Sequence, residues 1–89
     1  MKHFAIVVSG KVQGVFYRAS TKEQAESLDI KGFVRNEPNG DVYIEAEGAD
    51  DSIDKFIKWC HQGPSRAVVN SVKLTEKNLE GYPSFEVKR

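Results

Sequence analysis

The spacing of apolar residues along the chain predicts its strands first. Residues 4–8 form an unbroken apolar run rich in β-branched side chains, which is typical of a buried strand. In residues 42–47 every second position is apolar, so one face of this strand should meet a core and the other should meet water. Asn39-Gly40 separates this run from residues 33–36 and favours a tight hairpin, because both residues tolerate positive φ.

Two other segments have the three- and four-residue spacing that is typical of helices. The first predicts a helix over residues 17–29, with Gly32 as its left-handed stop. The second has acidic residues near its start and basic residues near its end, and Gly63 terminates it. Its apolar positions are Ile53, Phe56, Ile57 and Cys60.

The order of these segments defines the expected fold. Residues 67–74 and 85–87 predict two further strands, which the turn-rich segment 78–83 separates. The resulting order is β-α-β-β-α-β with a short terminal strand added. This order predicts a single α+β domain over residues 1–89, a ferredoxin-like split βαβ sandwich in which an antiparallel sheet has two helices on one face.

Composition narrows the possible function classes. The chain has 13 Lys plus Arg and 13 Asp plus Glu, and this balance argues against the broad basic surface that nucleic-acid backbones require. No apolar run approaches the roughly twenty residues of a membrane span, and the opening run is too short for a secretory signal. One cysteine and two histidines suggest neither a disulfide nor a zinc site. We therefore expect a cytoplasmic monomer without nucleic-acid or membrane partners, metal or cofactor.

Charge is uneven along the chain although it balances overall. Residues 1–22 contain four basic residues and no acid, whereas residues 37–54 contain seven acids and no base. Within the basic stretch, residues 10–18 form a strand-to-helix loop that has two glycines and ends at Arg18. Free amides at a helix start and a guanidinium fork together suit a phosphate or a carboxylate. The alternative is a tight turn with a solvated Arg18, and the G-x-x-x-x-G-K-[ST] pattern of a P-loop is absent.

The same loop resembles a known family signature. Residues 10–18, GKVQGVFYR, resemble the G-x-V-Q-G-V-x-[FY]-R signature of acylphosphatases, and residues 32–42 are similar to their second signature, which continues to Gly48. The resemblance spans the whole chain and implies an enzyme that hydrolyses acyl phosphates to a carboxylate and inorganic phosphate. It implies that Arg18 binds the phosphate and that Asn36 orients the attacking water. The substrate-binding loop would consist of Gly10, Lys11, Val12, Gln13, Gly14, Val15, Phe16 and Tyr17.

Acyl phosphate chemistry fits these residue types without reference to the family. The leaving group is a carboxylate, whose reference pKa is about 4, so protonating it at neutral pH gains little. The remaining tasks are to hold the phosphoryl group, to spread its charge over donors and to place a water in line with the bond that breaks. Arg18 and the loop amides suit the first two tasks. The Asn36 carboxamide suits the third, because it offers both a donor and an acceptor.

Two other function classes have weaker support. Residues 31–34 match the start of an RNA-recognition motif, but residues 35–38 break it, and Glu45 and Glu47 would face the RNA. A non-catalytic domain of the same fold could bind a small anion through the loop at residues 10–18. Asn36 distinguishes this third class from an enzyme, because a pure binder needs no amide that positions water.

The other reactive side chains are expected to be structural or solvated. His3 precedes the first strand and His61 lies near the end of the second helix, so neither is placed beside Arg18. Cys60 belongs to the apolar stripe of the second helix and Trp59 lies next to it, so both are expected to pack. The acidic residues at the start of this helix are better explained as charges that compensate the helix dipole than as ligands of a metal ion. These acids are Asp50, Asp51 and Asp54.

Overall fold

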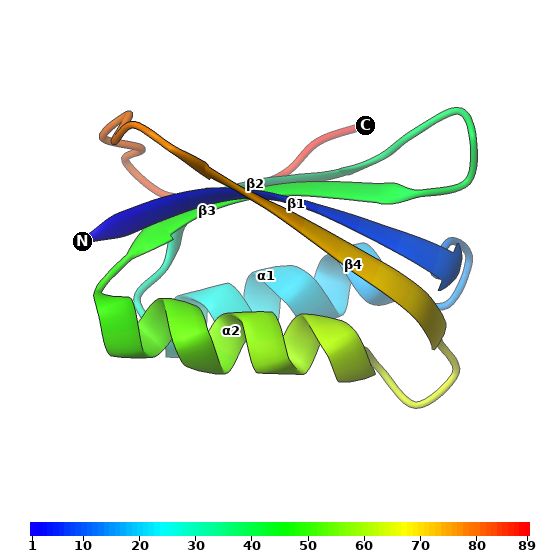
Figure 1. Cartoon of the computed structure of the whole chain (residues 1–89). Coiled ribbons are helices and arrows are strands. Elements are labelled where there is room, and N and C mark those ends of the chain that lie inside the picture. The colour runs from blue at the N-terminus through cyan, green and yellow to red at the C-terminus, as the bar shows by residue number, and fades with distance from the viewer.

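The computed structural model describes all 89 residues, from Met1 to Arg89. It contains one five-stranded sheet and two helices, and both helices cover the same face of the sheet (Figure 1). The elements are β1 (Lys2–Lys11), α1 (Tyr17–Ser27), β2 (Lys31–Asn36), β3 (Val42–Gly48), α2 (Asp50–Gln62), β4 (Val68–Lys77) and β5 (Phe85–Val87). The predicted α+β sandwich of ferredoxin-like order is confirmed.

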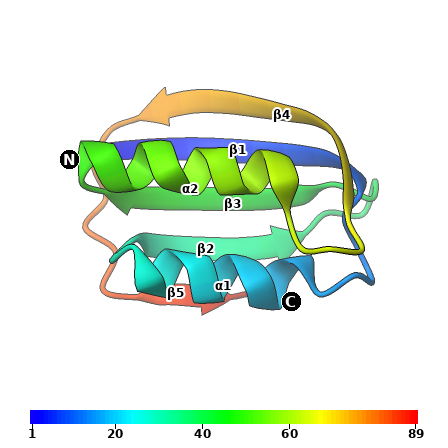
Figure 2. The same cartoon turned by 90° about the horizontal axis from the view of Figure 1, so that it is seen from below.

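The strands lie in the order β4-β1-β3-β2-β5 across the sheet. Strand β1 pairs antiparallel with β3 and β4, and β2 pairs antiparallel with β3. Strand β5 departs from the expected antiparallel arrangement, because it pairs parallel with β2. The chain leaves β4 at one edge, crosses the end of the sheet and enters β5 at the opposite edge (Figure 2). This single crossing gives β5 the direction of β2 and makes the sheet mixed.

The core lies between the helices and one face of the sheet. Alternate strand residues point into it, so Ile6 of β1 and Ile44 of β3 are fully buried. The apolar stripe predicted for the second helix is confirmed at Ile53, Phe56 and Cys60, which are buried on α2. Neither helix combines the length and the apolar character that a membrane crossing requires.

The end of helix α1 differs from the predicted glycine stop. The helix ends at Ser27, and Asp29 rather than a glycine adopts the left-handed conformation, with a φ of 55°. Gly32 lies within β2 at a φ of 143°, where a Cβ atom would be 1.9 Å from the carbonyl oxygen of Glu45. Gly32 therefore permits the close approach of β2 to β3, and its interpretation as the helix stop is wrong.

The sheet face opposite the helices has a hydrogen-bonded cluster around Glu45, whose side chain is buried. Its carboxylate accepts from the Tyr43 hydroxyl at 2.7 Å and the Tyr82 hydroxyl at 2.8 Å. It also lies 2.8 Å from Nε2 of His3 and 3.5 Å from Nζ of Lys77. Burial by itself raises the pKa of this carboxyl, but the hydrogen bonds and the lysine outweigh burial and hold the pKa at about 2.

Hydrogen bonds hold the connection from β4 to β5 against the same face of the sheet. Glu47 accepts hydrogen bonds from the backbone amides of Glu80, Gly81 and Tyr82. Nδ1 of His3 lies 2.6 Å from the carbonyl oxygen of Asn78. These contacts bury Glu47, so the expectation that this face of β3 meets water is wrong at its acidic positions.

The lowered pKa of Glu45 predicts a pH-dependent contribution to stability. The stabilisation is present above the ordinary carboxyl pKa of 4.5 and is lost as the pH falls through about 2. We expect Glu45→Gln to lower the free energy of unfolding at pH 7 by roughly 3 kcal/mol and to flatten the loss of stability between these pH values. Urea denaturation at several pH values measures this, with the exposed Glu86→Gln as control. An unchanged acid profile in Glu45→Gln would contradict the prediction.

Candidate active site

Positive φ values shape the loop between β1 and α1. Gly14 has a φ of 72°, and Phe16, which immediately precedes the helix, has a φ of 65°. The left-handed conformation costs a non-glycine residue about 1 kcal/mol or more, and such strain concentrates at functional loops. The buried Tyr17 hydroxyl donates a 2.7 Å hydrogen bond to the Cys60 carbonyl oxygen and ties the first turn of α1 to α2. Burial raises the pKa of the Tyr17 phenol, which keeps it protonated as a donor.

The start of helix α1 has the electrostatic character of an anion site. The first turn contains no acidic residue, and no side chain caps the helix. Its N-terminal amides therefore lack the side-chain acceptor that usually satisfies some of them. Free amides and the positive end of the helix dipole favour a bound phosphate or carboxylate.

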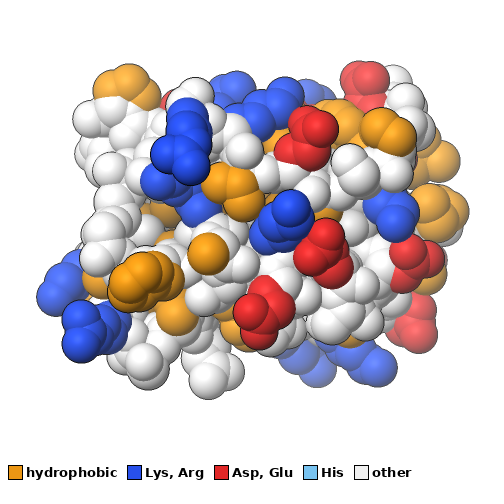
Figure 3. Space-filling view, turned by 180° about the vertical axis from the view of Figure 1, so that it is seen from behind, with side chains coloured by type: hydrophobic (Ala, Val, Ile, Leu, Met, Phe, Trp, Pro, Cys, Tyr) orange, Lys and Arg blue, Asp and Glu red, His pale blue; other side chains and the backbone are white.

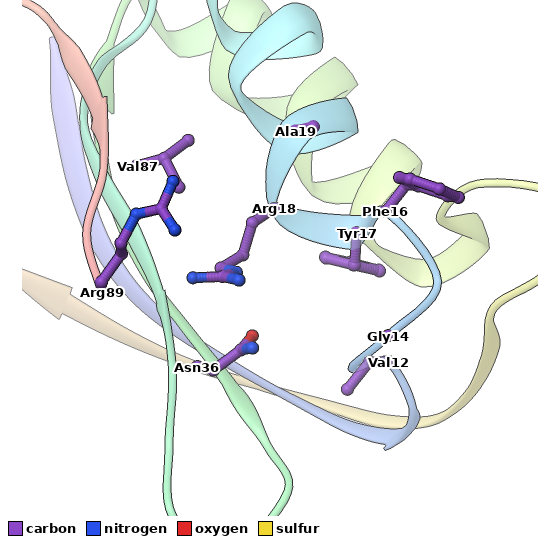
Figure 4. Close-up of a pocket in the computed structure, with 9 residues that line it drawn as sticks. All are labelled: Val12, Gly14, Phe16, Tyr17, Arg18, Ala19, Asn36, Val87 and Arg89. Carbon is purple, nitrogen blue, oxygen red and sulfur yellow. The ribbon is translucent and has the colours of Figure 1, made fainter.

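A cavity of about 470 Å³ opens beside this helix start. Its lining comes from the loop, the first turn of α1, the end of β2 and the C-terminal segment. Figure 4 shows the Arg18 guanidinium between Asn36 and the guanidinium of Arg89, with the loop on the other side of the cavity. No Asp or Glu is among the lining residues, which are Val12, Gly14, Phe16, Tyr17, Arg18, Ala19, Asn36, Val87 and Arg89. The cavity therefore has a positive field that favours an anion.

Arg18 is positioned at the helix start by the C-terminal segment. Its Nη1 donates a 3.3 Å hydrogen bond to the carbonyl oxygen of Lys88, and it forms no ion pair with any carboxylate. Lys88 is itself fixed, because its backbone amide donates to the Val34 carbonyl oxygen at 2.8 Å. One edge of the guanidinium is thus held by backbone, while the remaining donors can contact an anion.

Asn36 is the last residue of β2 and contributes an unusual polar atom. Its Oδ1 is buried, yet it has no hydrogen-bond partner within the chain. Buried polar atoms are almost always paired, and an exception indicates a functional role or a bound water. The structure places Asn36 and Arg18 in one cavity.

Gln13 connects the loop to the hairpin that follows Asn36. Its Nε2 donates to the carbonyl oxygens of Glu37 at 2.8 Å and Asp41 at 2.9 Å. Both carbonyls belong to the connection between β2 and β3. The sequence predicts Gln13 as part of the substrate-binding loop, and the structure shows that its side chain holds the hairpin. It therefore sets the distance between the loop and Asn36.

The loop residues predicted to bind substrate divide into two groups. Val12, Gly14, Phe16 and Tyr17 line the cavity, whereas Gly10, Lys11, Gln13 and Val15 are not part of its lining. Gly10 lies at a register shift in β1, where a Cβ atom would be 2.2 Å from the Val68 carbonyl oxygen. Val15 is buried in the core, and Lys11 is exposed at the end of β1. Within this second group, Gly10, Gln13 and Val15 shape and anchor the loop.

The sequence reasoning missed three lining residues, Ala19, Val87 and Arg89. Ala19 follows Arg18 in the first turn of α1, so it could have been inferred from the helix itself. The other two reach the cavity because β5 pairs parallel with β2, which the local sequence did not indicate. The alternation of Phe85, Val87 and Arg89 is the signal that would have placed them on one face of the strand.

The other reactive side chains lie away from this cavity. His3 is buried in the cluster around Glu45, and His61 is exposed near the end of α2, which confirms structural and solvated roles. Trp59 packs against Tyr17 and Phe56, as expected. No three His, Cys, Asp or Glu side chains come together as a potential metal site.

Cys60 is a buried core residue, and its structural role can be tested by substitution. Its thiol is fully buried, and burial raises its pKa to about 12 despite the nearby Tyr17 hydroxyl, which lowers it. The thiol stays protonated at neutral pH and is no nucleophile. We expect Cys60→Ala to keep kcat/KM within about twofold while losing roughly 1 to 2 kcal/mol of stability. Steady-state kinetics and thermal unfolding measure the two effects, and a tenfold loss of kcat in the folded variant would refute the structural role.

Together, the fold and the cavity define a small α+β protein in which the lining of a cavity between a helix start and the end of a strand favours an anion. The sequence model of the acylphosphatase family matches residues 4–87. The chain is 44% identical to the acylphosphatase of Rubrobacter xylanophilus over 88 residues, which cover 98% of this chain and 80% of that protein. The chain belongs to the acylphosphatase family.

Solved structures agree with this assignment. The crystal structure of an acylphosphatase from Bacillus subtilis superposes with a TM-score of 0.97 at 31% identity, and each chain is covered completely. The acylphosphatase from Coxiella burnetii superposes with a TM-score of 0.95 at 41% identity, covering 98% of this chain and 92% of that one. The resemblance noted in the two signatures is therefore confirmed over the whole fold.

Proposed function

We propose that this protein hydrolyses acyl phosphates in the cavity beside α1, with Arg18 and Asn36 as its catalytic residues. The observation that supports this best is the presence, in one cavity whose lining has no Asp or Glu, of a guanidinium without an ion-pair partner and a buried amide oxygen without a hydrogen-bond partner. Membership of the acylphosphatase family supports the same reaction. The substrate is a small molecule with a carboxyl-phosphate anhydride.

The proposed mechanism divides the work between the two residues. Arg18 and the amides at the start of α1 hold the phosphoryl oxygens and spread their negative charge. The Asn36 Oδ1 accepts a hydrogen bond from a water, and this turns an oxygen lone pair towards phosphorus. Attack forms a bond from the water oxygen to phosphorus, and one of the two water protons passes to a phosphoryl oxygen, so that inorganic phosphate is released as H2PO4⁻. The bond from phosphorus to the acyl oxygen breaks, and its electron pair leaves with the carboxylate.

No general acid is needed in this scheme, because the carboxylate is a stable leaving group at neutral pH. The cavity also has no set of oxygen or nitrogen ligands that would hold a cation, since its lining lacks Asp, Glu, His and Cys. We propose that the reaction needs no metal or cofactor. Arg18 and backbone dipoles instead stabilise the negative charge that develops on the phosphoryl group.

A cytoplasmic monomer that acts on a small molecule is the form we propose for the protein. In Figure 3 the charged side chains at the left are basic, whereas acidic side chains interrupt the basic ones in the middle and on the right, so no basic surface extends across this face. This does not favour a nucleic-acid backbone as partner. The open sheet face, which an RNA-recognition module would use, is partly covered by Tyr82, and Lys88 lies over the Phe33 ring there. Both observations support a small-molecule substrate.

Hydrolysis of benzoyl phosphate, followed by ultraviolet absorbance, tests the proposal directly. We expect the same turnover with and without a chelator, because no metal takes part. Inorganic phosphate is expected to inhibit competitively, since it would occupy the site of the transferred group. A strict metal requirement would overturn the mechanism. A folded protein that binds phosphate without turnover would leave the non-catalytic anion-binding domain as the function.

A further inference from the structure

We propose that Arg89 recognises a second anionic group on the acyl part of the substrate. The enzyme would then prefer acyl phosphates whose acyl chain ends in a carboxylate over those whose chain is neutral. This inference rests on the proposed function of the cavity and assigns a role to the wall opposite the loop. It is independent of the mechanism at the phosphoryl group.

Strand β5 determines which side chains of the C-terminal segment face the cavity. Val87 pairs with Val34 of β2, and the Lys88 amide continues the pairing with its hydrogen bond to the Val34 carbonyl oxygen. Successive side chains of a strand point to opposite faces. Phe85 is buried on the helix side, whereas Nζ of Lys88 lies over the Phe33 ring on the open side, 4.3 Å from its centroid. The alternation therefore places Val87 and Arg89 on the helix side, where both line the cavity.

The cavity has a second cationic side chain besides Arg18, which is Arg89. Arg18, the helix amides and the loop already surround the position of a phosphoryl group at the helix start, while Arg89 lies on the far side of the Arg18 guanidinium (Figure 4). Arg89 forms no ion pair with any carboxylate of the chain. Its guanidinium is therefore available to a ligand.

The cavity also has apolar surface that suits an acyl chain. Val87 and Ala19 contribute apolar surface to the same cavity. A substrate with its phosphoryl group at Arg18 would place its acyl chain in the same cavity, where Arg89 also lies. A carboxylate at the far end of a short chain matches the planar fork of a guanidinium, which can bind both carboxylate oxygens.

Succinyl phosphate and butyryl phosphate form a matched pair of probes, because both have four-carbon acyl groups and only the first ends in a carboxylate. We expect wild-type protein to prefer succinyl phosphate in kcat/KM. Arg89→Gln should reduce that preference by about 5- to 20-fold, mainly by raising KM for succinyl phosphate. A change of this size corresponds to the loss of one charge-assisted contact. Arg89→Glu should reverse the preference. Arg66→Gln is the matched control, because Arg66 is exposed in the loop after α2 and does not line the cavity.

Each outcome of this experiment decides the inference. A preference lowered in Arg89→Gln and Arg89→Glu but kept in Arg66→Gln supports it. An unchanged preference in the Arg89 variants overturns it, and so does an equal loss for both substrates, which would place Arg89 at the phosphoryl group. If wild-type protein hydrolyses butyryl phosphate without any preference, only the role of Arg89 fails. If it hydrolyses neither substrate, the proposed function fails with it.

Discussion

Arg18→Lys is expected to lower kcat/KM for benzoyl phosphate by at least 100-fold, on the order of the loss seen when a main transition-state donor is removed. Lysine keeps the positive charge but loses the planar fork that can contact two phosphoryl oxygens at once. It also loses the donor to the Lys88 carbonyl oxygen that holds the side chain at the helix start. Steady-state kinetics with benzoyl phosphate measure the effect.

The exposed Arg66→Lys variant is the control for Arg18→Lys, because it makes the same chemical change in the loop after α2. Circular dichroism and urea denaturation should show that both variants fold. If Arg18→Lys keeps most of its activity, charge alone at the helix start is sufficient. The proposed bidentate contact would then be wrong.

Asn36→Ala is expected to lower kcat about 100-fold while leaving the inhibition constant of inorganic phosphate nearly unchanged. The substitution removes the buried Oδ1 that has no partner within the chain, and with it the acceptor proposed to orient the water. The phosphoryl group is still held by Arg18 and the helix amides. Steady-state kinetics with phosphate as competitive inhibitor separate the two effects.

A substitution of Gln13 is a useful comparison for Asn36→Ala, because the Gln13 side chain positions the hairpin but does not line the cavity. If Asn36→Ala abolishes phosphate binding as well as turnover, the proposed division of labour between Arg18 and Asn36 is wrong. An Asn36 variant that keeps full kcat would point to another group, or to solvent, as the element that orients the water.

The sequence predicted most of the fold because the signals of its elements are local. The alternating residues of β3, the Asn39-Gly40 turn and the apolar stripe of α2 each depend on neighbours within a few positions. The errors occurred where a distant segment determines the conformation. The stop assigned to Gly32 failed because the approach of β3 requires that glycine, and the acids of β3 are buried by a loop that follows β4.

The candidate site was predicted only in part, because local motifs place some of its residues and distant segments place the others. The loop from Gly10 to Tyr17 and the positions of Arg18 and Asn36 follow from sequence motifs, and the structure brings both side chains into one cavity. Arg89 could not be placed from the motifs, because its position depends on the parallel pairing of β5 with β2. The side chain of Gln13 could not be placed either, since its acceptors belong to the hairpin 24 and 28 residues further along the chain.

The wide sequence separation of the paired elements also has a kinetic consequence. His3 on β1 contacts Asn78, which lies 75 residues further along the chain, and β1 cannot acquire both of its neighbours until β4 is in place. Topologies dominated by such distant pairings fold slowly, on a scale of about milliseconds to seconds. The cavity combines residues from the first helix, the second strand and the C-terminal segment. Catalytic activity during refolding should therefore return only with the complete sheet, so its recovery measures the last step of folding.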